Sequence, residues 1–344
     1  MKYWYKLVLV LCVIAITGCS IIGGNDYYDS GDKNADKELP SAKEKVLSID
    51  PEPNPEEQTI TLYFKHRYSD YLVPEVRTAV RDKQTWEQLV VEELLKGSEY
   101  HDRTAIMPPG VEVLDITRKG ETVFVNLSEE FIGDIDLAEV PGKEETTEER
   151  SAAVKAEMKL LSIYSIVDSL TELAGVNQVK FLVENRAISY IDLDEHLRAL
   201  MFPQWTEMGE DERENAVLTA LFRDRSYILT PAKSVQTVFE GLLGEPKWDK
   251  VYSLLASETA SKDRLPTKEE LERLWPVLVN GLELDDEFIV DEEIKPDGKA
   301  FVTVSYTVNY TSGQKEEMNR DRITVVSEDD IWKVKLPEFI TDFR

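Results

Sequence analysis

The chain has 344 residues with 67 acidic and 40 basic side chains, which gives a formal net charge of −27 at pH 7. Such an acidic surface disfavours nucleic acid and anionic lipid headgroups as partners, and it favours solubility and cationic partners. The length suits two domains, each able to bury a hydrophobic core without disulfide or metal staples. The two cysteines, Cys12 and Cys19, lie in the first segment, so they cannot cross-link the body of the chain.

The amino terminus has the pattern of an export signal. Two lysines precede the unbroken apolar run Leu7–Ile16, which is too short for a membrane span and typical of a signal-peptide core. The run leads into Ile-Thr-Gly-Cys, ending at Cys19, and this resembles the lipobox of bacterial lipoproteins. By this resemblance residues 1–18 are a lipoprotein signal peptide, and the Cys19 sulfur carries a diacylglycerol. That lipid would hold the chain on the outer face of the bacterial cytoplasmic membrane. An ordinary secretory signal with an incidental cysteine is the alternative.

Residues 19–57 are predicted to be a disordered tether. They are rich in Asp, Glu, Lys, Asn, Gly and Pro, and low hydrophobicity with dense charge argues against a packed core. Three alternating prolines, Pro51, Pro53 and Pro55, favour an extended spacer at its end. We expect the tether to hold the folded part away from the membrane.

Residues 58–204 are predicted to form the first folded domain. Thr85 and Gln88 resemble a capping box at the start of a helix that ends at Lys96-Gly97. Pro74 indicates an edge or bulge position in its strand. A charged insertion, residues 133–151, is expected to be a surface loop. The stretches rich in β-forming residues that predict strands are 59–64, 71–81, 111–117, 121–127 and 179–183.

A long helix followed by a strand, residues 154–183, organises this domain. Two apolar rows widen its stripe beyond a simple amphipathic face, so the helix must be largely covered. The first row is Leu160, Ile163, Tyr164, Val167, Leu170 and Ala174, and the second is Met158, Leu161, Ile166 and Leu173. Gly175 stands where a left-handed cap would end the helix. The element order β-β-α-β-β-α-β predicts an α+β sandwich with helices on one face.

The motifs of this domain resemble those of the GerM domain family. They are TLYFKHRYSDYLVPEVR, VVEELLKGS, PPGVEVLDITRKGETVFVNLSEEF and LLSIYSIVDSLTELAGVNQVKFLVENR, in the family's order. The resemblance implies an extracytoplasmic lipoprotein of a spore-forming bacterium, linked to sporulation or spore germination. It implies action by protein–protein packing, similar to the ring-building modules of envelope assemblies, with no catalytic residues and no cofactor to carry over. Tandem copies of the domain occur in the family, and this chain departs from that arrangement.

A polar link, residues 205–215, is predicted to lead into a second α+β domain, residues 216–344. Its first part faintly echoes the first domain, which indicates either a decayed repeat or chance. Helices are expected from Ser234 and Trp248 and over 268–279. Predicted strands are 288–294, 299–310, 318–326 and 331–336. Helices followed by a meander of long strands resemble the nuclear-transport-factor-like, or cystatin-like, roll, in which a sheet curls around a helix.

Residues with catalytic or metal-binding chemistry are sparse in this sequence. The three histidines, His66, His101 and His196, are far apart and lack metal-ligand spacing. His66 and Asp70 lie near each other in a turn, and we interpret them as two solvated loop residues. The acidic cluster of residues 285–293 lacks the glycine and the alternating ligands of a calcium loop, so a solvated acidic surface is expected. The sequence therefore predicts no catalytic residue, no metal site and no cofactor.

Two functional hypotheses follow from the sequence. The first is a membrane-anchored, non-catalytic interaction module of the cell envelope, whose partners are envelope proteins or further copies of itself, with peptidoglycan as another candidate and no nucleic acid. The second is a protein that binds a small ligand, or hydrolyses peptidoglycan, in a pocket of the second domain. A solvent-filled pocket lined by polar side chains inside the roll would favour the second hypothesis. A roll filled by apolar side chains would count against it.

Overall fold

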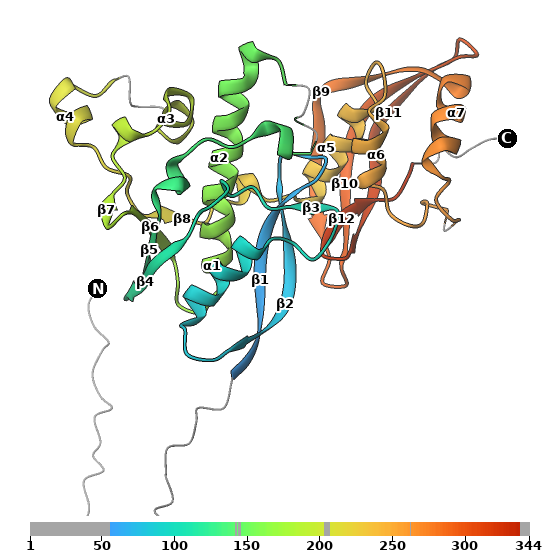
Figure 1. The fold of residues 1–344 in the computed structure, drawn as a ribbon. Helices are drawn as coiled ribbons and strands as arrows, with labels where there is room; N and C mark the ends of the chain where they lie inside the picture. The colour runs from blue at the N-terminus through green and yellow to red at the C-terminus, as the bar shows by residue number, and fades with distance from the viewer. Residues whose placement is uncertain (1–55, 142, 144–145, 203–206, 262, 338–344) are drawn as a thin grey trace, which may run out of the picture. The chain divides into compact units, whose positions relative to one another are not determined.

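The computed structural model describes residues 56–141, 143, 146–202, 207–261 and 263–337 (Figure 1). The predicted signal peptide, Cys19 and the tether up to residue 55 lie outside these residues. The described residues belong to one compact unit. Within the described ranges, no helix is both long enough and apolar enough to cross a membrane.

The first sheet is antiparallel and has the strand order β2-β1-β3. Its strands are β1 Glu56–His66, β2 Leu72–Arg81 and the short β3 Arg103–Thr104. Pro74 lies in β2 opposite Tyr63, and β2 is an edge strand, so the edge position predicted for this proline is confirmed. The strand β1 begins at Glu56, inside the segment predicted to be tether.

The second sheet combines a hairpin with a parallel crossover. Strands β4 Val113–Lys119 and β5 Thr122–Leu127 form the hairpin, and Gly120 supplies the positive φ of +63° that its tight turn requires. Strand β6 Gln178–Val183 pairs parallel with β5 after the crossover through the long helix α2. The far side of β6 pairs with β7 Arg186–Ala187 and with β8 Leu221–Phe222. The segment around β8 was predicted to open the second domain, yet it pairs with this sheet.

Two helices pack against both sheets. Helix α1 Trp86–Lys96 contacts β1 and β4, and helix α2 Glu148–Leu170 contacts β1 and β6, as Figure 1 shows for α2. Thr85 caps α1 by accepting the Gln88 N–H at 3.2 Å. The Gln88 side chain does not complete the expected capping box, because it donates to the Glu92 side chain instead of bonding back to Thr85.

Helix α2 begins six residues before its predicted start and ends at Leu170, with Thr171 as its last cap. Gly175, expected to end the helix, lies in the turn that follows and has a φ of +74°. A Cβ atom there would stand 2.7 Å from the Arg118 guanidinium, so both the backbone and the neighbouring side chain favour glycine.

The second part of the chain is a sheet curled into a half-barrel around a helix, as the resemblance to a roll implied. Helix α5 Pro231–Gly241 contacts all four strands of this sheet, whose order is β12-β11-β10-β9. Thr230 caps α5, so the cap expected at Ser234 is wrong and Ser234 lies buried in the first turn. The strands are β9 Val279–Ile294, β10 Lys299–Tyr310, β11 Lys315–Glu328 and β12 Ile331–Val334. Register shifts along β9 and β10 allow the bend.

The remaining elements are short. The helices are α3 Glu195–Met201, α4 Glu210–Asn215, α6 Trp248–Ser253 and α7 Lys268–Leu278, and the 3₁₀ turns are η1 Glu129–Ile132, η2 Leu137–Glu139, η3 Tyr190–Asp192 and η5 Arg225–Tyr227. Helix α4 lies in the segment predicted to be a polar link. The domain boundaries drawn from the sequence stay predictions.

Two large hydrophobic clusters hold the structure together. One joins the first two sheets with α1 and α2, and the other fills the half-barrel around α5. Val73 of β2 belongs to the half-barrel cluster, and the Leu229 N–H donates to the Leu72 carbonyl at 2.9 Å. The edge strand of the first sheet is therefore packed into the core of the second part.

Candidate functional site

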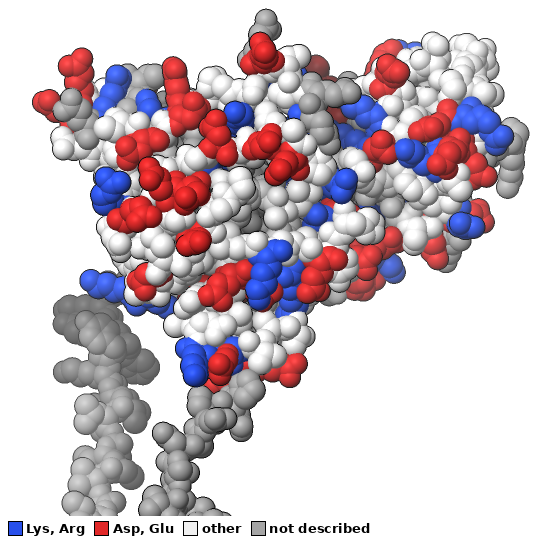
Figure 2. All heavy atoms as spheres, in the orientation of Figure 1, with Lys and Arg blue, Asp and Glu red and all other residues white. Residues whose placement is uncertain are grey.

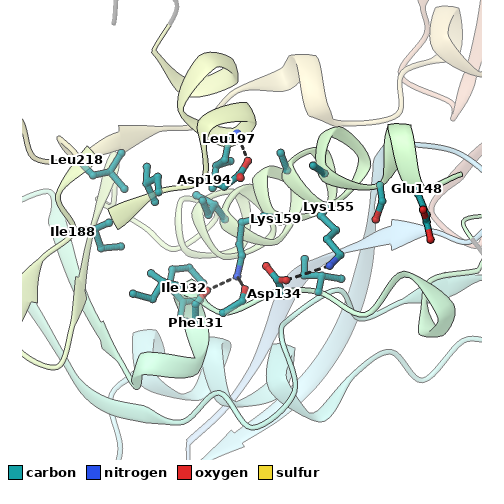
Figure 3. A pocket seen from close by; sticks show the side chains of 17 residues that line it. Phe131, Ile132, Asp134, Glu148, Lys155, Lys159, Ile188, Asp194, Leu197 and Leu218 are labelled. Carbon is teal, nitrogen blue, oxygen red and sulfur yellow. Dashed lines mark hydrogen bonds and ion pairs between the residues drawn. The ribbon is translucent and has the colours of Figure 1, made fainter. Parts of the chain in front are cut away.

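A pocket of about 310 Å³ lies along one side of α2 (Figure 3). Three stretches form its walls: α2 from Glu148 to Ile163, the η1 turn with the residues up to Ile135, and the segment 188–218. Most of its lining is aliphatic or aromatic, with Lys155, Lys159, Asp134 and Asp194 as the charged groups nearest its centre in the close-up view. Its size and apolar walls fit a small ligand or the side chain of a partner.

Lys159 is the buried charge of this pocket. Its Nζ donates to the carbonyls of Phe131 at 2.5 Å and Gly133 at 2.6 Å, so it satisfies the end of the η1 turn. Burial lowers the pKa of Lys159 to about 8, and the Asp134 carboxylate opposes that shift. Lys155 pairs with Asp134 at 3.1 Å near the rim. The amine therefore has a structural role, and the pocket is suited to binding.

The serines of α2 bind the backbone of β1. Strand β3 pairs with only two residues of β1, which leaves the backbone of Tyr63 open on that edge. Ser169 Oγ accepts the Tyr63 N–H at 2.9 Å, and Ser165 Oγ donates to the Tyr63 carbonyl at 2.5 Å. Buried backbone groups need such partners. Ser165 thus supports the packing of α2 as a core helix.

A polar cluster sits at the end of α2. Arg223 pairs with Glu172 at 2.5 Å and also donates to the Tyr63 hydroxyl. Burial pushes the pKa of Glu172 up, but hydrogen bonds from Arg223 and Tyr63 outweigh it and lower that pKa. Burial raises the pKa of Asp168 to about 7, opposed by Arg223 and by the backbone N–H of Asp224.

Neither carboxylate oxygen of Asp168 meets hydrogen-bond geometry with any described residue. The sequence places no histidine or cysteine beside Asp168 and Glu172 of the long helix, so it predicted no catalytic chemistry for them. It gave no sign of Arg223, which lies 51 residues beyond Glu172 and reaches the cluster only through the fold.

The interpretation of His66 and Asp70 as a solvated pair is wrong for His66. The imidazole is fully buried at the end of β1, where Nδ1 lies 3.1 Å from Ser69 Oγ. Burial, together with the charges of Lys333, Lys65 and Arg103, lowers its pKa to about 3. Asp70 is exposed and pairs with Lys143 at 3.0 Å. The prediction that His66 lies in a solvated loop was wrong because β1 extends two residues beyond its predicted end and places His66 in the interior.

The acidic residues 285–293 lie along β9. Within them Glu292 accepts the Ala232 N–H at 2.7 Å, and Glu293 pairs with Arg322 at 2.6 Å. Across the described residues, no group of three or more His, Cys, Asp or Glu side chains has the arrangement of a metal site. The interior of the half-barrel is filled, because Phe239 of α5 packs on Phe288 and Tyr306 with ring centroids 5.1 and 4.9 Å apart. That filling counts against a ligand pocket inside the roll.

The hairpin of β1 and β2 presents an exposed face of β-branched side chains. On β2, Val76 is 45% exposed and Val80 is 55% exposed, with exposed Thr78 between them. Thr59 of β1 lies opposite Thr78 and is exposed as well. Apart from a bridge between Leu72 and Ile228, no strand of the described chain pairs with the outer edge of β2.

Residues 61–189 match the model of the Germane family, whose description is "Sporulation and spore germination". The chain thus carries a GerM-like domain over these residues, which confirms the resemblance drawn from its motifs. No curated protein matches the chain.

Two solved structures from Bacillus subtilis are similar to this chain. The tandem GerMN domains of the sporulation protein GerM share 17% identity over 40% of this chain and 41% of theirs, with a TM-score of 0.27. The first GerMN domain of the same protein shares 14% identity over 38% of this chain and 84% of that one, with a TM-score of 0.25. The chain thus spans less than half the length of the tandem structure.

Proposed function

We propose that this protein is a lipid-anchored, non-catalytic interaction module of the cell envelope that serves sporulation or germination. The open edge of β2, with its exposed β-branched face, carries the proposal. An unpaired strand edge offers a row of N–H and C=O groups to another chain, and an apolar face adds contact area. The partner is an envelope protein or a second copy of this chain.

The inward face of β2 holds the edge strand in place. Arg77 donates to the fully buried Glu75 at 2.6 Å, to Glu93 of α1 at 3.1 Å and to the Gly97 carbonyl at 2.5 Å. Ser98 bonds to the other oxygen of Glu75 at 2.5 Å. A strand fixed this firmly presents its outer edge without a large ordering cost, which favours binding by strand addition.

The first experiment tests the edge. Replacing Val76 and Val80 by lysine places two charges on the exposed face while leaving the core intact. A photo-cross-linker at Thr78 of the full chain in its native membrane should capture one discrete envelope protein, or the chain itself, and the double variant should lose that product. Val277→Lys is the matched control, because Val277 is 64% exposed on α7. Equal capture by the double variant and the control would refute the edge as the interface.

The second experiment tests the anchor. Replacing Cys19 by alanine removes the thiol that would carry the lipid, so the protein should leave the membrane fraction. Cys12→Ala, within the predicted signal core, should leave membrane retention unchanged. If Cys19→Ala stays in the membrane fraction, the anchor proposal is wrong.

Small-ligand binding is a second candidate function, and the pocket of Figure 3 favours it. Its place differs from the roll interior expected from the sequence. Ala152 is an exposed residue that lines the pocket, so Ala152→Trp should block it at little cost to folding. Native mass spectrometry of the full chain should show a co-purified small molecule that the Ala152→Trp variant loses. A ligand-free wild type would count against this candidate.

A further inference from the structure

A second and larger hollow, about 950 Å³, differs in character from the rest of this acidic protein. It is lined by the end of β1, by the segment that leads into α2, by the start of α6 and by one residue of α7. We call it the basic cleft, after the six cationic side chains in its lining. These are Lys65, Arg67, Lys143, Arg150, Lys247 and Lys250, against Asp70, Asp249 and Glu272.

The acidic side chains of the basic cleft are already neutralised. Asp70 pairs with Lys143 at 3.0 Å, and Lys268, which is not part of the lining, pairs with Asp249 at 2.7 Å and approaches Glu272 at 3.9 Å. Because these ion pairs neutralise the acidic side chains of the lining, the charge that faces the hollow comes mainly from the remaining cations.

Four of the cations have no acidic partner among the residues that the structure describes. Within the described chain, no carboxylate lies at ion-pair distance from Arg67, Arg150, Lys247 or Lys250, although Arg67 has a weak bond to the His101 carbonyl at 3.4 Å. Acidic residues outnumber basic ones in this chain, and they are spread across the face shown in Figure 2. Like charges gathered around one hollow repel each other, and a bound anion would relieve that repulsion.

The wall behind the cleft is also positively charged. Lys65 is 1% exposed, and its Nζ donates to the carbonyls of His66 and Arg67 at 3.0 and 3.3 Å. The neighbouring Arg103 is 4% exposed and pairs with Asp102 at 3.4 Å, and the charges of Lys333, Lys65 and Arg103 lower the pKa of the buried His66. Buried charges are screened by water far less than exposed ones, so they reinforce the field inside the cleft.

Two aromatic side chains stand among these cations. Trp248 and Tyr68 both line the cleft and are half-buried. Trp248 is held edge-on to Trp275 with ring centroids 6.0 Å apart, and the Arg67 guanidinium lies over the Tyr68 ring at 5.8 Å. Flat aromatic faces beside cations suit a ligand that alternates ring-like or polyol units with negative charges.

We propose that the basic cleft binds an anionic glycan, a chain of sugar or polyol units that carry single carboxylates or phosphodiesters. Arg67, which follows β1, and Arg150 of α2 hold one side of the ligand, and Lys247 and Lys250 hold the other. The aromatic faces contact the uncharged parts of its units. An acidic protein segment would use the same cations but would gain little from the two aromatic faces.

The test measures binding of defined polymers to the purified full chain by isothermal titration. Oligogalacturonate supplies carboxylates on sugar rings, polyglycerol phosphate supplies phosphodiesters on a polyol, and a chitin oligosaccharide is the uncharged comparison. We expect at least one anionic polymer to bind, the uncharged one not to bind, and the affinity to fall as salt is raised. Which anionic polymer binds more tightly identifies the charged group.

Charge reversal locates the site. Lys247→Glu with Lys250→Glu should lower the affinity about tenfold or more. Lys83→Glu with Lys119→Glu is the matched control, because both lysines are exposed and lie outside the cleft. The proposal is overturned if neither anionic polymer binds, or if the cleft variant binds as well as the control. Equal or tighter binding of polyglutamate would also overturn it, in favour of an acidic protein partner.

Discussion

At the residue scale, Asp168 is an acidic side chain in a buried environment. It is fully buried on α2, and its carboxylate has Arg223 nearby without hydrogen-bond geometry to any described residue. Burial disfavours the charged form, which is why its pKa rises to about 7 from 3.8. The folded protein therefore holds a proton on Asp168 over a range of pH in which the unfolded chain has lost it.

This proton predicts a pH dependence of stability. Between pH 3.8 and about 7 the folded state binds more protons than the unfolded state at Asp168, so this residue makes stability fall as pH rises through that window. Asp168→Asn should remove the fall and should be more stable than the wild type at pH 8 by a few kcal/mol. Urea unfolding at pH 5 and pH 8 measures this difference.

The matched control for Asp168→Asn is Asp285→Asn, which removes an exposed carboxylate of β9. It should leave the difference between the two pH values as in the wild type. An Asp168→Asn variant that keeps the wild-type difference would show that Asp168 is ionised in the folded protein throughout this range.

At the element scale, the long helix α2 packs against strand β1. The helix covers the bare edge of β1, and two serines take over the hydrogen bonds that a longer β3 would have made. The apolar rows predicted from the sequence are buried, since Leu160, Ile163, Val167 and Leu170 all lie in the core. The serines between those rows gave no indication in the sequence that α2 contacts β1, because Ser165 bonds to a backbone carbonyl that lies 102 residues away along the chain.

Removing those serines should destabilise the protein. Ser165→Ala and Ser169→Ala each leave one backbone group of Tyr63 buried without a partner, which costs about 1–3 kcal/mol. Ser162→Ala is the control, since the buried Ser162 hydroxyl bonds only to the Lys159 carbonyl of its own helix. The free energy of unfolding from urea titration compares the three. Equal losses for all three variants would mean that the bonds to Tyr63 contribute nothing beyond burial of the hydroxyl.

At the scale of the whole molecule, the GerM-like part and the half-barrel share a hydrophobic core at β2. Val73 is fully buried among side chains of the half-barrel, and Leu72 accepts a backbone bond from Leu229. Arg103 also donates to the Asp329 carbonyl. These contacts predict that both parts unfold in one cooperative step.

Calorimetry of the full chain tests this prediction. The wild type should show a single unfolding transition, and Val73→Ala should lower its midpoint without splitting it, at a cost of about 2 kcal/mol. Val277→Ala, an exposed valine of α7, should leave the midpoint in place. Two separate transitions in the wild type, or a shift of only one of them in Val73→Ala, would contradict cooperative unfolding.

Local signals in the sequence were enough to predict most of the helices and strands. The strand over residues 299–310 has its predicted bounds, because its apolar and polar residues alternate over its whole length, and the Lys119-Gly120 dipeptide is the sequence signal for the turn between β4 and β5. Motif order alone placed the GerM-like domain, and the family match over residues 61–189 confirms it. Element ends were less well predicted, as at His66, because pairing with a distant strand extends β1 past its apolar run.

The acidic charge, most of the helices and strands and the GerM-like domain were predictable from residue type and near neighbours along the chain, whereas β3, β7 and α4 were not predicted. Which polar residues lie together is visible only once the chain is folded. Arg223 joins Tyr63 and Glu172, and Lys65 and Lys250 line one cleft, across separations of 51 to 185 residues. No periodicity in the sequence predicts these long-range contacts, because they depend on how sheets and helices pack through their hydrophobic faces. The charge of the basic cleft is therefore visible only in the folded chain, against a sequence that is acidic overall.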